Sequence, residues 1–120
     1  MPVGDNPIHT ILAFNAVAVV KSTSSYSEVI DVKSLANSGN FSVEWTTVGT
    51  GTGKIEYLIC STIDGTFIEP SGASDIKASM AAGHDGIAFT PVLAPYMKLK
   101  ISETAGSSNI TAFTVYLNIQ

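Results

Sequence analysis

Residues 48–57, Val-Gly-Thr-Gly-Thr-Gly-Lys-Ile-Glu-Tyr, are the part of the chain that comes nearest to a phosphate-binding loop. A Walker-type loop needs Gly, four residues, Gly, Lys and then Ser or Thr, so that backbone amides and the lysine hold phosphate while the hydroxyl binds magnesium. Val48 stands where the first glycine is required, and Ile55 stands where the hydroxyl is required. The dinucleotide spacing Gly-x-Gly-x-x-Gly is missed as well, and residues 54–59 read as a strand instead of the helix that such loops open. We therefore predict a turn between two strands, with Lys54 opening the second.

Metal-ligating and nucleophilic residues are few and scattered. His84 and Asp85 are adjacent, but neighbouring residues in an extended chain point apart, and His9 is distant in sequence. No cysteine or second histidine completes a zinc set, no acidic run has the spacing of a calcium loop, and no serine lies in Gly-x-Ser-x-Gly. Both histidines are expected on solvated turns. The sequence thus predicts no catalytic, cofactor-binding or metal-binding residues and no cofactor. One alternative is left: two of the ten acidic residues could lie close enough in the fold to cleave a glycosidic bond.

Cysteine and tyrosine residues offer two further kinds of chemistry. Cys60 is the only cysteine, so the chain cannot form an internal disulfide, and we expect a buried or half-buried thiol because an apolar run precedes it. The four tyrosines could stack on sugars if they are exposed, or they could pack at sheet edges or at a subunit contact, which we favour. These residues are Tyr26, Tyr57, Tyr96 and Tyr116.

The composition bounds the class of protein. The 120 residues suit a single domain, and the formal net charge of -4 arises from ten acidic residues, six lysines and no arginine. This balance argues against nucleic-acid binding, which rewards clustered positive charge. Charged residues make up 13% of the chain against about 25% in an average protein, which suits either packing within an assembly or a weakly charged β protein. No signal peptide is recognised, and the apolar run of residues 11–20 is too short to span a bilayer, so we expect a soluble protein with no membrane contact.

Strand patterns dominate the chain. Residues 41–47 alternate most clearly and predict Phe41, Val43, Trp45 and Thr47 on the core side. In the last strand we place Thr111 in the same buried row as Phe113, Val115, Leu117 and Ile119. Further strands are predicted at 16–21, 28–32, 54–61, 67–69, 86–89, 96–104 and 110–119. The chain is predicted to reverse at Asp64-Gly65 and at Asp85-Gly86, and residues 91–95 are predicted to form a crossing segment. Residues 73–82 could form either a helical turn or an edge strand.

About eight short strands without a sustained helical period predict an all-β fold. We expect a single-domain antiparallel β-sandwich or jelly roll over residues 11–120, preceded by an N-terminal arm over residues 1–10.

Residues 41–120 also carry a resemblance to a known class of protein. FSVEWT, the Gly/Thr turn, KIEYLICSTIDGTFIEP and later FTPVLAPYMKLKISETAGSSNITAFTVYL form a succession of strands and turns. This succession resembles the small β-sandwich structural proteins of tailed-bacteriophage virions, of the head decoration, neck or tail type. The resemblance implies no catalytic residues to carry over. It implies a homo-oligomer, with a trimer favoured, bound to a capsid lattice, and an arm (residues 1–10) ordered on a neighbouring subunit.

We therefore expect a non-enzymatic virion structural protein, most of all a capsid decoration protein that binds the outer capsid surface and stabilises the head. Its partners would be the major capsid protein or other virion proteins, and its location the virion, assembled in the host cytoplasm. The alternative is a tail- or fibre-associated carbohydrate-binding or adhesin module, suggested by the strand tyrosines. A small enzyme is a third interpretation.

Overall fold

The computed structural model describes residues 7–36 and 38–120, and within these ranges it contains nine strands and one short helix. The elements are β1 (His9–Val19), β2 (Ser24–Tyr26), β3 (Ile30–Asp31), α1 (Val32–Leu35), β4 (Phe41–Gly49), β5 (Gly53–Cys60), β6 (Asp75–Met80), β7 (Gly83–Phe89), β8 (Tyr96–Glu103) and β9 (Ile110–Ile119). The first six residues of the expected N-terminal arm lie outside the described residues. Its last two, His9 and Thr10, begin β1 and pair with Ile119 and Asn118 of β9.

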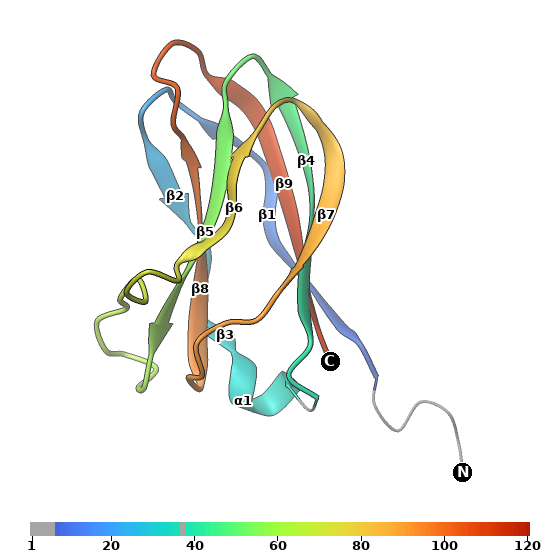
Figure 1. The fold of residues 1–120 in the computed structure, drawn as a ribbon, viewed down its shortest axis with the longest axis vertical. Helices are drawn as coiled ribbons and strands as arrows, with labels where there is room; N and C mark the ends of the chain where they lie inside the picture. The colour runs from blue at the N-terminus through green and yellow to red at the C-terminus, as the bar shows by residue number, and fades with distance from the viewer. Residues whose placement is uncertain (1–6, 37) are drawn as a thin grey trace.

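The strands form two antiparallel sheets that face each other (Figure 1). The first sheet has the order β1-β9-β4-β7, and the second has the order β2-β8-β5-β6, with β3 also pairing with β8. Among consecutive strands, only β5 and β6 are neighbours within one sheet, and most other connections cross between the sheets. This arrangement is that of a jelly roll, and it confirms the predicted antiparallel β-sandwich.

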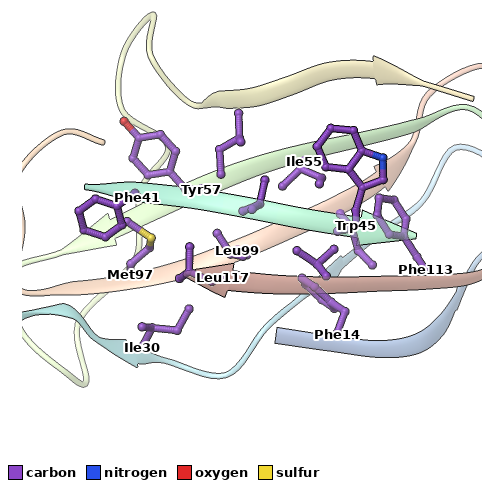
Figure 2. Packing of buried hydrophobic residues seen from close by; sticks show 14 of the residues in the cluster. Phe14, Ile30, Phe41, Trp45, Ile55, Tyr57, Met97, Leu99, Phe113 and Leu117 are labelled. Atoms are coloured by element: carbon purple, nitrogen blue, oxygen red, sulfur yellow. The ribbon is translucent and has the colours of Figure 1, made fainter. Parts of the chain in front are cut away.

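The core fills the space between the sheets (Figure 2). Trp45 of β4, Leu99 of β8 and Phe113 of β9 are each at most 3% exposed, so side chains from both sheets pack against one another. The alternation of residues 41–47 is confirmed, because Phe41, Val43, Trp45 and Thr47 are all buried. Thr47 is the polar member of this row, and its hydroxyl donates a hydrogen bond of 3.1 Å to the Ala81 carbonyl, which offsets the cost of burying it.

The reversal predicted at Asp85-Gly86 is wrong. These residues lie inside β7, which pairs with β4 without interruption from Gly83 to Phe89, and the chain instead reverses at residues 81–82. Gly86 serves close packing, because a Cβ there would lie 3.0 Å from the Val43 carbonyl oxygen. The hydrogen-bonded pairing of β7 with β4 therefore outweighs the local preference of Asp-Gly for a turn.

The predicted reversal near Asp64-Gly65 is placed correctly but differs in detail. The turn closes from the Gly65 amide to the Thr62 carbonyl at 3.4 Å, so Gly65 ends the turn instead of occupying its centre. The strand expected at 67–69 is reduced to one bridge between Ile68 and Ile59. Of the two alternatives predicted for residues 73–82, a helical turn or an edge strand, the structure shows the edge strand β6.

The row in the last strand also needs a correction, because Thr111 is exposed and Ile110 is buried. The register between β4 and β9 shifts by one residue between Val48 and Gly49, as in a β-bulge. Gly49 has a φ of 108°, which favours glycine, and the shift turns Ile110 into the core. The Thr111 hydroxyl instead donates to the Val48 carbonyl at 3.0 Å.

Candidate interaction surfaces

The glycine-rich segment is confirmed as a connection, and it joins β4 to β5 in opposite sheets. Its amides already have partners, since the Gly51 amide donates to the Asn109 carbonyl at 3.2 Å and the Thr52 amide donates to the Glu103 carboxylate at 2.9 Å. Lys54 points its ammonium at Asp75, 3.3 Å away. A phosphate would have to compete with these internal bonds, which supports the structural interpretation.

Glu103 is a buried carboxylate that the sequence reasoning did not single out. It is 2% exposed, and its two oxygens accept four backbone N–H bonds of 2.8–3.1 Å. The donors are the amides of Ser22, Thr52, Ala105 and Gly106. The bond from the Thr52 amide, with those from the other three, lowers the pKa of Glu103 from its ordinary 4.5 to about 2. This carboxylate ties together three connections at one end of the sandwich, and it is ionised at neutral pH.

The outer face of the second sheet carries a charged network. Lys100 contacts Glu69 at 2.8 Å and Glu56 at 3.7 Å, while Lys54 contacts Glu56 at 3.7 Å and Asp75 at 3.3 Å. The hydrogen bond between Lys100 and Glu69 lowers the pKa of the Glu69 carboxyl and raises that of the Lys100 ammonium. Lys98 lies on the same face as Lys100, and its ammonium is 4.8 Å from the centre of the Phe67 ring. These groups are paired with one another, which is the arrangement of a solvated or loop-covered face.

The outer face of the first sheet differs in that its described strands carry no lysine and Glu44 is the one carboxylate among its outward residues; we call it the uncharged face for this shortage of charge. Its outward residues follow from the register, because they alternate with the buried rows of β1, β9, β4 and β7. They include Thr10, Leu12, Ser42, Glu44, Thr46, His84, Gly86, Ala88, Thr114, Tyr116 and Asn118. No lysine lies on these four strands as described, whereas four of the six lysines lie on strands of the second sheet. On this face His84 Nε2 lies 2.5 Å from the Glu44 carboxylate, a hydrogen bond that is an ion pair only when the imidazole is protonated.

Short polar side chains line one end of the uncharged face. The Thr10 hydroxyl donates to Asn118 Oδ1 at 2.7 Å, and Asn118 Nδ2 lies 3.4 Å from the Ser42 hydroxyl. These residues join β1, β9 and β4 in one row. A shallow hollow of about 490 Å³ opens there, with Ser42, Asn118 and Ala88 in its lining and Ile8 beside them.

The two histidines lie on strands and not on turns, which corrects the prediction. His9 begins β1, and His84 lies in β7 opposite Thr46, where its ring contacts the diagonal neighbour Glu44 instead of joining Asp85. Among residues 7–36 and 38–120, no three His, Cys, Asp or Glu side chains gather as a metal ion would require. Cys60 is half-buried, as expected, with its sulfur 3.8 Å from the Thr62 hydroxyl.

The tyrosines do not form a shared stacking platform. Tyr57 is buried, and its hydroxyl accepts a hydrogen bond of 2.8 Å from the Val92 amide. Tyr26 pairs with Lys100 on the outer face of the second sheet, whereas Tyr116 lies on the uncharged face. The half-buried Tyr96 has the Lys33 ammonium 5.1 Å from its ring centre. The two most exposed rings, Tyr26 and Tyr116, are therefore on opposite sides of the molecule and cannot stack on one sugar chain together.

Comparisons with known proteins concern the fold. No protein-family model matches the chain, and no curated protein matches it in sequence. Among solved structures it is similar to PirA, with a TM-score of 0.52 and 13% sequence identity over 91% of this chain and 90% of that one. It is also similar to a chain of the infectious bursal disease virus Gx strain, with a TM-score of 0.46 and 16% identity over 93% of this chain but only 32% of that one. A Bacillus endospore appendage protein matches with a TM-score of 0.42 and 14% identity over 100% of this chain and 96% of that one.

Within the described part of the chain, no helix has the length and apolar character needed to cross a membrane.

Proposed function

We propose that the chain is a non-enzymatic structural protein of a virion, of the kind that decorates a tailed-phage capsid, and that it binds through its uncharged face. Two independent features support this proposal. One is the resemblance of residues 41–120 to small virion β-sandwich proteins. The other, which carries the proposal, is the separation of charge between the two outer faces of the sandwich.

The uncharged face is suited to burial against a flat protein surface. Burying a lysine or a carboxylate without hydrogen-bond partners costs solvation free energy; this face presents no lysine, and its Glu44 carboxylate is hydrogen-bonded to His84. Its outward residues are mostly Ser, Thr, Ala and Gly, which allow a second surface to approach closely. Four strands about 4.8 Å apart, with β9 extending about 34 Å, present roughly 650 Å², close to the ~800 Å² per partner of a standard interface.

The proposed partners are the major capsid protein or other virion proteins, and the proposed location is the virion, assembled in the host cytoplasm. Because such a protein binds only the assembled lattice, it stabilises that lattice by mass action. No bound cofactor is needed for this role.

The experiment uses virus particles assembled without this chain, to which purified chain is added back before sedimentation. Thr46→Lys places a charge at the centre of the uncharged face, and Ala78→Lys places the same charge on exposed β6 of the second sheet. We expect the wild-type chain and the Ala78→Lys variant to sediment with particles, and Thr46→Lys to bind at least about tenfold more weakly, since a buried unpaired charge costs more than 1.4 kcal/mol. If no form sediments with particles, the virion role is wrong. If all three bind equally, another surface makes the contact.

A further inference from the structure

The α1 helix and the β7–β8 connection lie at the same end of the sandwich (Figure 1). Large apolar side chains are exposed in the connections at this end. Leu93 is 96% exposed, and Ile63, Ile68 and Val92 are 59%, 58% and 43% exposed. All four belong to the β5–β6 or β7–β8 connection. Exposure of Leu93 to this degree leaves almost its whole side chain in water, which is unfavourable unless another surface covers it.

Leu93 is held on a rigid support. It lies between Pro91 and Pro95, whose rings fix their φ angles. The Val92 amide donates to the Tyr57 hydroxyl at 2.8 Å, and the Pro95 carbonyl accepts from the Lys33 amide at 3.2 Å. Both anchors belong to the folded body, so the leucine is presented in a fixed position and loses little conformational entropy when it binds.

Two hollows border Leu93 and its neighbour Ala94. One, of about 220 Å³, is lined mainly by apolar residues that include Val32, Ala36, Phe41 and Met97. The other, of about 340 Å³, extends toward Cys60 and Ile68. Among the residues that the structure describes, no Lys, Asp, Glu or His lines either hollow. Since an apolar cavity of about 150 Å³ can hold a benzene molecule, the 220 Å³ hollow has room for a leucine side chain.

We propose that a second copy of this chain docks on this end, with Leu93 of each copy inserted into the 220 Å³ hollow of the other. The projection and the hollow adjoin each other in one chain, so a two-fold axis beside Leu93 makes both contacts at once, as an isologous interface requires. The molecule measures 32 by 22 Å across its long axis, and these overall extents enclose a cross-section of about 700 Å², an upper bound for a flat contact at this end. This area is near the ~800 Å² per partner of a standard interface. The pairing leaves the centre of the uncharged face free for the proposed virion contact, although the 220 Å³ hollow shares Gly39, Phe41 and Thr90 with the hollow beside Ser42 and Asn118. A two-fold dimer takes the place of the trimer that the resemblance implies.

The test measures the association of the full chain by sedimentation velocity over a range of concentrations. We expect a monomer–dimer equilibrium for the wild type. Leu93→Ser removes two inserted leucines per dimer and should weaken it at least about 100-fold. The exposed Leu93 contributes little to the fold, so this variant should melt as the wild type does. The control is Val48→Ser, which removes an exposed apolar side chain (54% exposed) outside both hollows and should leave the dimer unchanged.

A mixing experiment tests the reciprocal geometry. Ala36→Leu fills the hollow but keeps the projecting leucine, whereas Leu93→Ser keeps the hollow but lacks the projection. Each variant alone should remain monomeric, and a mixture should restore one of the two contacts, associating about tenfold more tightly than Leu93→Ser alone. A wild-type chain that stays monomeric, a trimer in place of a dimer, or a dimer unaffected by Leu93→Ser would each overturn the proposal.

Discussion

At the scale of single residues, Glu103 has a clear role in stability. Because its pKa is about 2 in the folded protein against an ordinary 4.5, its carboxylate stabilises the fold fully above pH ~4.5. That contribution is lost progressively as the pH falls from 4.5 towards 2. Glu103→Gln puts an amide N–H₂ where backbone donors point, so we expect a melting temperature lower by several degrees at pH 7. The gap to wild type should narrow as the pH is lowered, which thermal unfolding at a series of pH values would measure.

The matched control for this change is Glu28→Gln, at an exposed carboxylate outside the Glu103 hydrogen bonds. It should leave the melting temperature nearly unchanged at each pH. A Glu103→Gln variant as stable as wild type at pH 7, or a deficit that widens on acidification, would contradict the assigned role.

Ala16 is a second residue whose backbone conformation affects the stability of the fold. It occupies a bulge in β1 with a φ of 52°, a left-handed conformation that costs an alanine about 1 kcal/mol. Ala16→Gly should therefore raise the free energy of unfolding by about 0.5–1 kcal/mol in urea titration. The same change at the exposed Ala18, whose φ is not positive, should lower it by a similar amount. Equal effects of the two substitutions would count against strain at Ala16.

At the scale of elements, the β4–β5 connection is limited by packing. A Cβ at Gly51 would lie 2.8 Å from the Ile110 side chain and 2.9 Å from the Asn109 carbonyl carbon, although the φ of Gly51 is not positive. We expect Gly51→Ala to lower the free energy of unfolding by about 1–3 kcal/mol, because buried backbone must move. Lys54→Ala, in the next strand, should cost about 1 kcal/mol or less, since it removes partly exposed ion pairs. Chemical denaturation of both variants measures the difference, and the reverse order would show that the loop has room.

The strands that the sequence predicted best are those with one buried face. The alternation of residues 41–47 reflects burial against the opposite sheet, and that row is buried as predicted. Met97, Leu99 and Ile101 alternate in the same way within the strand predicted at 96–104, and they are buried too. The wrong predictions concern residues whose conformation is set by pairing with a strand distant in the sequence. Asp85-Gly86 is a strong turn signal by itself, but β4 provides a full ladder for residues 83–89. The bulge that exposes Thr111 likewise depends on a partner strand distant in sequence.

The candidate surface could be predicted only in part. The low fraction of charged residues was visible in the sequence and suggested either packing in an assembly or a weakly charged β protein. The separation of charge between two faces was not visible, because it depends on the strand order β1-β9-β4-β7, which joins the two ends of the chain. The Glu103 bonds were missed for the same reason, since their donors come from three separate connections.

At the scale of the whole molecule, the jelly roll presents two unlike faces, one with a charged network and one without lysine. Binding through the uncharged face should depend weakly on salt, because few exposed charges are involved. We expect the affinity for particles to change by less than about threefold when salt rises from about 0.05 to 0.5 M, a range over which the Debye length falls severalfold. Sedimentation at both salt concentrations measures this. A loss of binding of tenfold or more at high salt would indicate that the charged face makes the contact.

The most direct measurement of the virion role is to band intact virus particles from the source in a density gradient and to quantify this chain in each fraction with an antibody. The proposed role predicts that the chain bands with the particles, at a fixed ratio to the major capsid protein through repeated banding. A chain that remains at the top of the gradient, with none in the particle band, would contradict it.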